Sequence, residues 1–131
     1  MGTALKLCPD LKTISYDFEG YQEVAKTLYD TVSKYTLEIQ AVSCDEMLVD
    51  LTEVTEDCNM SPKEFSKTLR DEIYKATGCT ASVGLGPSML LARLATRKAK
   101  PDGIFAVETE DAQEFMRTVS VQELPGNEFL I

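Results

Sequence analysis

The sequence predicts an α+β domain in which an antiparallel sheet carries helices packed on one face. Residues 37–41 and 47–51 have strand-like patterning and are separated by a short break, which is typical of an antiparallel hairpin. Residues 21–35, before the hairpin, and 61–78, after it, place apolar side chains at helical spacing. A chain of 131 residues fits one domain of ordinary size.

The first half of the chain contains the first elements in a simple order. After a first helix with a frayed end, residues 11–16 are expected to form a short strand. A helix then follows over residues 21–35, and the two hairpin strands come next. The break between those strands contains Cys44, Asp45 and Glu46.

The helix after the hairpin has clear start and stop signals. Ser61 is expected to cap it, with Pro62 at its first position, Glu64 completing a capping box and Gly78 ending it in a left-handed conformation. Its buried stripe is expected to consist of four apolar residues: Phe65, Leu69, Ile73 and Ala76.

The second half continues with alternating strands and helices. Residues 79–85 are expected to form a strand, Ser88 to cap a helix, residues 104–107 to form a short strand and residues 111–118 a last helix. The order is β-α-β-β-α-β followed by α-β-α. The first six elements match the ferredoxin-like split motif, whose sheet leaves one face open for a polymer to lie across.

Composition excludes several classes of protein. No apolar stretch approaches the ~20 residues needed to cross a bilayer, and no signal peptide is evident, so a soluble intracellular protein without a membrane partner is expected. The four cysteines form no CxxC pair and are expected to be reduced and partly buried. Histidine is absent, which excludes the Ser-His-Asp and Cys-His routes to nucleophilic catalysis.

The charge of the chain is unevenly distributed. A net charge of −9 argues against a free-standing nucleic-acid binder, because attraction to phosphates supplies most non-specific affinity. Four cations nevertheless fall within eight residues, which indicates a local anion site: Arg93, Arg97, Lys98 and Lys100.

The acidic pair Asp45 and Glu46 is the first candidate site. At a bend, adjacent carboxylates can converge on one cation, and Mg²⁺ prefers carboxylate oxygens and supports phosphoryl and nucleotidyl transfer. From the residue pattern alone, an ordinary solvated acidic turn is the alternative. Asp50, a third acid near the hairpin, is expected to have a structural role.

The stretch from residue 82 to residue 103 is the second candidate site. Its glycines allow close backbone approach, and the start of the following helix is oriented to face an anion. Lys100 is placed to hold a phosphate, with Arg93 and Arg97 as further phosphate or DNA contacts. The alternative is a solvated basic helix end. The tyrosines, in contrast, are expected mostly to pack in the core: Tyr16, Tyr21, Tyr29, Tyr35 and Tyr74.

Three segments together resemble the Y-family of translesion DNA polymerases. Residues 43–52 contain SCDE and LVDLT, which are similar to that family's second carboxylate motif. Residues 82–103 resemble the family signature after the next strand, and they read SVGLGPSMLLARLATRKAKPDG. Within the family, these segments and residues 16–36 resemble the deoxycytidyl (dCMP) transferase branch, and the resemblance extends over roughly residues 4–126.

The resemblance implies a palm domain and a set of site residues. Asp45 and Glu46 would be metal ligands, for two Mg²⁺ ions in the complete site, and Lys100 would contact the incoming triphosphate. The family branch inserts dCMP opposite guanine, abasic or damaged template sites during DNA repair. Its partners would be primer-template DNA, dCTP and other translesion-synthesis proteins, in the nucleus.

The chain also departs from the family pattern. The family's third metal-binding carboxylate lies on an earlier strand, before the fingers, and no candidate precedes Leu11. Residues 1–123 are therefore expected to be a palm fragment that is inactive alone, and 124–131 the start of the thumb connection or a non-native tail. The alternative is a non-catalytic ferredoxin-like interaction or nucleotide-binding module. A nucleotide cyclase also places acids on such a hairpin, but the segment ending in Lys100 argues against it.

Overall fold

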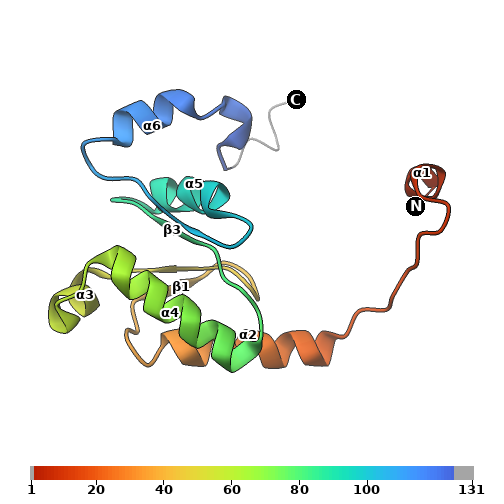
Figure 1. Cartoon of the computed structure of the whole chain (residues 1–131), viewed down its shortest axis with the longest axis horizontal. Coiled ribbons are helices and arrows are strands. Elements are labelled where there is room, and N and C mark those ends of the chain that lie inside the picture. Colours follow the sequence, from red (N-terminus) through yellow and green to blue (C-terminus); the bar gives the residue numbers. More distant parts are fainter. Residues whose placement is uncertain (1, 126–131) are drawn as a thin grey trace.

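The computed structural model describes residues 2–125, which form six α-helices, four short strands and one 3-10 helix (Figure 1). In chain order these are α1 (Gly2–Leu7), α2 (Phe18–Val32), β1 (Ile39–Ala41), β2 (Met47–Val49), α3 (Thr52–Cys58), α4 (Pro62–Thr77), β3 (Val83–Leu85), α5 (Met89–Ala99), β4 (Ile104–Ala106), α6 (Ala112–Thr118) and η1 (Val121–Glu123). Most of the predicted tail at 124–131 lies outside the described residues.

The α+β class and the central antiparallel hairpin are confirmed. β1 pairs with β2 in the register that places Ile39 opposite Val49 and Ala41 opposite Met47. The single sheet of the expected ferredoxin-like motif is not formed by the described residues, where the strands make two separate pairs, one antiparallel and one parallel. β3 and β4 pair in parallel because α5 connects them as a crossover helix, and a crossover returns the chain in the same direction.

The predicted strand at residues 11–16 is also wrong. Residues 11–17 form neither a helix nor a strand, and in Figure 1 this segment runs alone between α1 and α2. With no strand beside it, its backbone has no ladder to join. The short helix α3 was not expected, because Val54 is its one buried residue and its sequence therefore shows no apolar stripe.

Helix α4 forms as its end signals predict. The Ser61 hydroxyl accepts a hydrogen bond from the Glu64 amide at 3.3 Å, and the Glu64 carboxylate accepts one from the Ser61 amide at 3.0 Å. These two bonds satisfy amides that the first helical turn leaves free. Gly78 ends the helix with a φ of 71°. Three residues of the predicted stripe, Phe65, Leu69 and Ile73, are buried, whereas the fourth, Ala76, is exposed to solvent.

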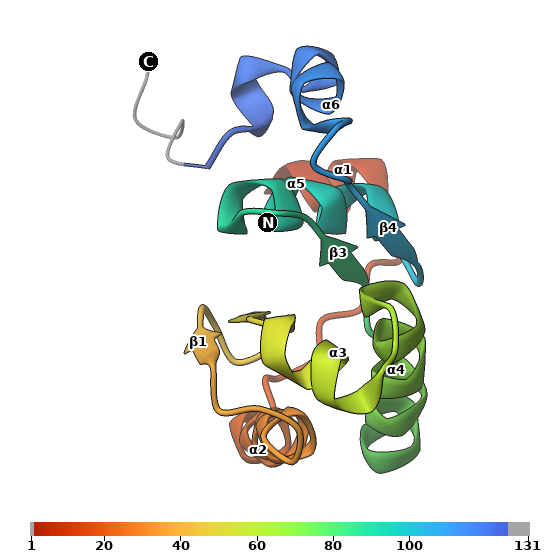
Figure 2. The same ribbon diagram turned by 90° about the vertical axis from the view of Figure 1, so that its left-hand side faces the viewer.

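Two apolar clusters form the core, one for each strand pair. The first joins α2, α3 and α4 beneath the hairpin and contains Val32, Val54, Phe65, Leu69 and Ile73. The second lies between α5, the end of β4 and α6 and contains Leu91, Ala95 and Val107. Figure 2 shows the hairpin with α2, α3 and α4 in the lower part and α5, β3 and β4 above them. We call these the hairpin lobe (residues 18–79) and the α5 lobe (residues 82–118).

Helix α4 connects the two lobes, since it contacts β3 and β4 as well as α2. The Arg70 Nε donates a hydrogen bond to the Ala81 carbonyl oxygen at 2.6 Å. The same guanidinium forms an ion pair with Asp102, in the turn before β4. Arg70 therefore ties α4 to the turn that precedes β4 and to the segment that leads into β3.

The close backbone approach predicted from the glycines occurs at Gly84, and the approaching group is α5. A Cβ atom at this position would lie 2.1 Å from the Thr96 amide nitrogen and 2.2 Å from the Ala92 carbonyl oxygen. Only glycine fits between β3 and a helix at that distance. Gly84 thus sets how closely α5, which carries the basic residues, packs on the strand beneath it.

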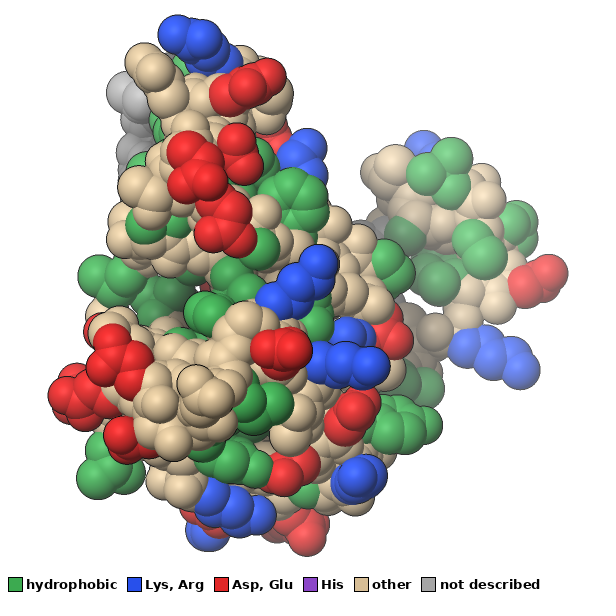
Figure 3. Space-filling view, turned by 60° about the vertical axis from the view of Figure 1, so that its left-hand side comes forward, with side chains coloured by type: hydrophobic (Ala, Val, Ile, Leu, Met, Phe, Trp, Pro, Cys, Tyr) green, Lys and Arg blue, Asp and Glu red, His purple; other side chains and the backbone are tan. Residues whose placement is uncertain are grey.

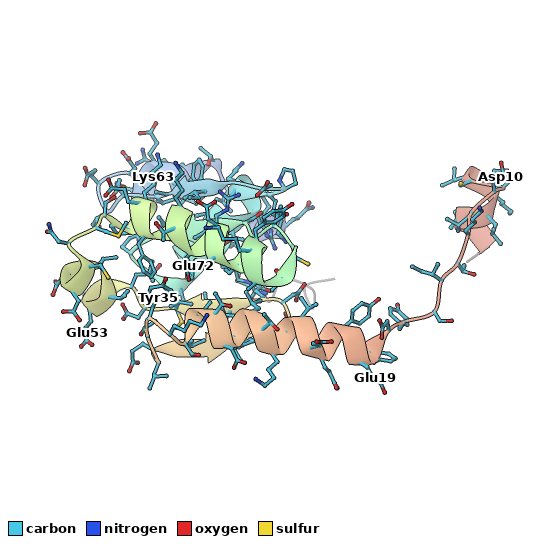
Figure 4. All side chains as sticks on the ribbon, turned by 60° about the horizontal axis from the view of Figure 1, so that its bottom comes forward. Asp10, Glu19, Tyr35, Glu53, Lys63 and Glu72 are labelled. Atoms are coloured by element: carbon cyan, nitrogen blue, oxygen red, sulfur yellow. The ribbon has the colours of Figure 1, made fainter. Side chains whose placement is uncertain are left out.

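The N-terminal part of the chain contributes little to either core cluster. Helix α1 has no buried residue and stands away from the two lobes in Figures 1 and 4. The expected burial of tyrosines is wrong for Tyr16, Tyr21 and Tyr74, which are 77%, 48% and 56% exposed. Tyr16 and Tyr21 contact each other and Phe18 at the start of α2 instead of entering the core.

Two further surface properties are clear among residues 2–125. All four cysteines are free and exposed, so the expectation that they are partly buried is wrong; none lies at a position that packs against a core cluster. None of the helices in this part of the chain is both long and apolar enough to cross a bilayer.

Candidate functional site

The acidic pair lies in the tight turn that closes the β1–β2 hairpin. The backbone amides of Val42 and Ser43 both donate hydrogen bonds to the Glu46 carbonyl oxygen, at 3.0 and 2.9 Å. This pattern folds the chain back within four residues. It presents Asp45 fully at the surface and leaves Glu46 half-buried on the side of the hairpin.

Ser43 orients the Asp45 carboxylate. Its hydroxyl donates to Asp45 Oδ1 at 2.5 Å, and it accepts a longer bond of 3.4 Å from the Asp45 amide. This bond from Ser43 restricts the rotation of the Asp45 side chain and holds its carboxylate at the tip of the turn.

Tyr29 reaches the same turn from helix α2. Its hydroxyl group donates to the Ser43 carbonyl oxygen at 2.8 Å and to the Glu46 carbonyl oxygen at 3.2 Å. The sequence analysis assigned Tyr29 to core packing and missed this contact. Its ring is half-buried, and a half-buried tyrosine usually finds a partner for its hydroxyl, which is the signal that was available.

Arg93 brings the second candidate segment to the first. It projects from α5, and its Nε lies 3.6 Å from Glu46 Oε1, while both side chains are 44% exposed. The two motifs, far apart in the sequence, thus meet across the space between the hairpin lobe and the α5 lobe. The predicted phosphate or DNA contact of Arg93 is not tested by this geometry.

The remaining basic residues lie at the C-terminal end of α5. Lys100 is the residue at which α5 ends; it is exposed, and its backbone amide donates to the Thr96 carbonyl oxygen at 3.1 Å. Within residues 2–125 its ammonium group has no hydrogen bond or ion pair. It is therefore available to an anion.

Arg97 and Lys98 lie near an acid of the 3-10 helix η1. The pKa of the Glu123 carboxyl is lowered, first by hydrogen bonds from Ser120 and in smaller part by the charges of Lys98 and Arg97. The charges of Arg97 and Lys98 are thus partly balanced by the Glu123 carboxylate. The charge of Lys100 is balanced less than theirs.

Asp50 has the structural role that the sequence predicts. Its carboxylate accepts hydrogen bonds from the Thr52 amide at 2.9 Å and the Thr52 hydroxyl at 2.6 Å, where α3 begins. These bonds, the side-chain one first, lower the pKa of the Asp50 carboxyl. Asp50 therefore supports the start of α3, and its Oδ1 atom accepts both of these bonds.

The donor set of the turn fits a hard divalent cation in kind, because carboxylate oxygens are the ligands that such cations prefer. It does not by itself make a full site. In the described part of the chain, no three His, Cys, Asp or Glu side chains gather where they could hold a metal ion. The turn therefore offers two carboxylates, those of Asp45 and Glu46, with Arg93 beside the second of them.

The surface charge around these elements is mixed. In Figure 3, acidic side chains gather over the upper end of the molecule, where α6 lies, and basic side chains are interspersed with acids lower down. This face has no continuous basic stripe of the kind that tracks a nucleic-acid backbone. A local anion site at the exposed cations of α5 stays a prediction of the sequence.

Comparisons with known proteins agree on one family. Residues 1–97 match the profile of the impB/mucB/samB family. The chain is 54% identical over 127 residues to the DNA repair protein Rev1 of Drosophila melanogaster, covering 96% of this chain and 13% of that protein. It is 42% identical to the DNA repair protein REV1 of Arabidopsis thaliana, covering 94% of this chain and 11% of that protein. With DNA polymerase IV of Citrobacter koseri the identity is 34%, over 95% of this chain and 35% of that protein.

Solved structures match the fold. The insertion ternary complex of Dbh DNA polymerase superposes with a TM-score of 0.85 at 22% identity, over 98% of this chain and 37% of that one. The crystal structure of DinB from Sulfolobus solfataricus gives 0.83 at 23% identity, over 95% and 36%. At such identities the likeness extends to the fold alone. The chain spans only about an eighth of the length of the eukaryotic relatives and about a third of the bacterial one.

Proposed function

The chain belongs to the impB/mucB/samB family, the Y-family translesion DNA polymerases, and is most similar to its dCMP-transferase branch; from this membership we propose that it is the catalytic palm of a template-directed DNA nucleotidyltransferase. The reaction we propose is insertion of dCMP opposite guanine, abasic or damaged template sites during translesion synthesis. The partners would be primer-template DNA, dCTP and other translesion-synthesis proteins, and the location the nucleus, in keeping with the DNA repair proteins that this chain resembles.

The ion pair between Arg93 and Glu46 is the observation that supports this proposal best. It joins the acidic turn and the basic helix, the two segments that carry the family resemblance, at 3.6 Å. A site for a nucleoside triphosphate needs both kinds of group. Carboxylates bind the metal cations, and basic side chains bind the phosphates. The exposed Lys100 lies at the end of the same helix.

We assign Asp45 and Glu46 as the ligands of Mg²⁺ in this site. Bound Mg²⁺ neutralises triphosphate charge and lowers the pKa of an attacking hydroxyl. The protein's own contribution is to hold two carboxylates at a rigid turn, with Asp45 oriented by the Ser43 hydroxyl. To bind the metal cation, the Glu46 carboxylate has to give up its ion pair with Arg93. The Arg93 guanidinium is then free.

Lys100 is assigned to the triphosphate as a point charge, since its ammonium group has no partner within the described residues. Arg93, once released from Glu46, and Arg97 are further contacts for phosphates of the nucleotide or of DNA. Two carboxylates without a third acid nearby are a weak cation site, so we expect no primer extension by this chain alone.

Titration of the ¹⁵N-labelled chain with Mg²⁺ and dCTP, followed by NMR, tests the proposal. Chemical-shift changes are expected at residues 43–46 and around Lys100. The double variant Asp45→Asn, Glu46→Gln should lose them. The matched control is another adjacent acidic pair, Glu56 and Asp57 on α3, both of which are exposed; the Glu56→Gln, Asp57→Asn variant should behave like the wild type.

The same titration separates the alternative. Changes confined to residues away from the turn and from Lys100, or no changes at all, would contradict the proposed site and favour a ferredoxin-like interaction module. Shifts that persist in the double variant would exclude Asp45 and Glu46 as the ligands.

A further inference from the structure

The structure gives Tyr29 a place that its spacing in the sequence does not reveal. It lies on α2, between the half-buried Leu28 and the buried Thr31 and Val32, and this helix is fixed against α4 by the first core cluster. From there its hydroxyl extends to the tip of the β1–β2 hairpin. A single hydroxyl proton is shared between the carbonyl oxygens of Ser43, at 2.8 Å, and Glu46, at 3.2 Å.

These two carbonyl groups belong to the residues that control both carboxylates of the turn. Ser43 holds the Asp45 carboxylate through its own hydroxyl at 2.5 Å. Glu46 carries the second carboxylate directly. A contact from Tyr29 therefore passes to Asp45 through Ser43 and to Glu46 through its own backbone.

The turn needs such a support. Each strand of its hairpin is three residues long, and a two-stranded hairpin alone is only marginally stable in water. Adjacent carboxylates repel each other, and Asp45 is exposed. A cation site requires its oxygens to be held within about 0.5 Å by groups that are themselves locked in place.

A tyrosine is suited to that task. Its side chain has only two rotatable torsions, and its ring is half-buried. It connects an exposed turn to a packed helix without itself adding charge.

We infer that Tyr29 is a positioning residue for the Asp45–Glu46 pair, whose hydroxyl holds both ends of the turn so that the two carboxylates converge on one divalent cation. This inference rests on the proposed function. It adds a residue from α2 to a site otherwise built from the hairpin and α5.

The test uses Mn²⁺ as the probe, because its paramagnetism broadens the NMR signals of nearby nuclei even when binding is weak. The wild-type chain should show broadening centred on residues 43–46. Tyr29→Phe removes only the hydroxyl, and it should weaken Mn²⁺ binding about ten-fold, as loss of groups that orient ligands typically does. The amides of Val42 and Ser43 should also exchange with solvent faster in this variant.

Tyr35→Phe is the matched control. Tyr35 is another half-buried tyrosine of the hairpin lobe, and its hydroxyl donates to the Glu72 carboxylate at 2.6 Å, away from the turn. This variant loses a hydrogen bond at least as strong, so it should lower stability while leaving the Mn²⁺ dissociation constant within two-fold of the wild type. A purely structural role for Tyr29 predicts that the two variants behave alike.

The outcomes separate the inference from the proposed function. If Asp45→Asn abolishes the broadening and Tyr29→Phe leaves it unchanged, the positioning role is overturned and the metal site stands. Equal loss of Mn²⁺ binding in Tyr29→Phe and Tyr35→Phe also overturns it, because stability alone would then explain the effect. If the wild type shows no broadening at residues 43–46, both the metal site and the positioning role fail.

Discussion

Arg93 on α5 faces Glu46 on the β1–β2 turn, with 3.6 Å between the guanidinium Nε and the carboxylate Oε1. A cation of the protein therefore lies beside the second carboxylate of the turn. The pair couples the charge of the acidic turn to that of the basic helix. Any ligand that takes one partner releases the other.

Replacing Arg93 with glutamine should tighten divalent-cation binding at Glu46. Both partners are 44% exposed, so solvent screens the pair, and exposed ion pairs contribute about 0.2–1 kcal/mol. We therefore expect the Mn²⁺ dissociation constant to fall by less than about five-fold. Stability should change by less than about 1 kcal/mol.

Arg117→Gln provides the control for that measurement. It removes the same charge from an exposed position on α6, so any effect of net charge alone appears in it as well. Weaker Mn²⁺ binding in Arg93→Gln than in Arg117→Gln would mean that Arg93 assists the cation site instead of competing for it.

Gly84→Ala should destabilise the α5 lobe. The added methyl group would lie 2.1 Å from the Thr96 amide nitrogen and 2.2 Å from the Ala92 carbonyl oxygen, both of them backbone atoms that cannot rotate away. Helix α5 would have to move off β3, at a cost of about 1–3 kcal/mol in the free energy of unfolding. Urea denaturation measures this change.

The matched comparison is Gly78→Ala, at the end of α4. No heavy atom lies within 4 Å of a Cβ there, but the φ of 71° is unfavourable for alanine. Backbone strain alone should cost about 1–2 kcal/mol. A Gly84→Ala variant no less stable than Gly78→Ala would show that α5 can shift at little cost.

Sequence reasoning succeeds where the determinants are local. Helix α4 was predicted from Ser61, Glu64 and Gly78 because each acts within one turn of its own position. The hairpin was predicted because alternation and a short break suffice to define it. The parallel pairing of β3 with β4 depends instead on how α5 returns the chain over Gly84, and no pattern within either strand indicates it.

The candidate site shows the same division. Asp45, Glu46 and the basic segment were identified from residue type and from family resemblance. The contacts of Tyr29 with the turn and of Arg93 with Glu46 each join different elements. Spacing predicts the face of the helix on which Tyr29 lies but not the group that its hydroxyl contacts, and the core packing expected for most of the tyrosines did not distinguish Tyr29 from the others.

Tyr35 should make the stability of the wild type depend on pH in the alkaline range. The hydrogen bond to Glu72, and in smaller part burial and the charges of Glu72 and Cys58, raise the pKa of Tyr35 above its usual 10.0. Tyr35 and Glu72 lie next to each other in Figure 4. In the unfolded chain the phenol ionises near its usual pKa, while the folded chain still holds the proton.

The contribution of Tyr35 is therefore fully present below pH 10.0 and is lost as the pH rises through its folded-state pKa. Thermal unfolding followed from about pH 8 to about pH 11 should show a steeper fall in Tm for the wild type than for Tyr35→Phe. Parallel curves for the two proteins would mean that the Glu72 contact does not persist in solution.

In a complete polymerase that contains this segment, the acidic pair and Lys100 should affect different kinetic constants. Asp45→Ala with Glu46→Ala removes the proposed cation ligands, and nucleotide insertion should fall by roughly a thousand-fold or more, because a metal ion supplies several kcal/mol of charge stabilisation in the transition state.

Lys100→Ala removes the proposed contact to the triphosphate, which is made before and during the reaction. It should therefore raise KM for dCTP more than it lowers kcat. Lys98→Ala, at the same end of α5 but near Glu123, is the control and should leave both constants close to those of the unmodified enzyme. Normal insertion by the double variant would remove the acidic turn from the catalytic site, and equal effects of Lys98→Ala and Lys100→Ala would reduce Lys100 to one charge of a diffuse basic surface.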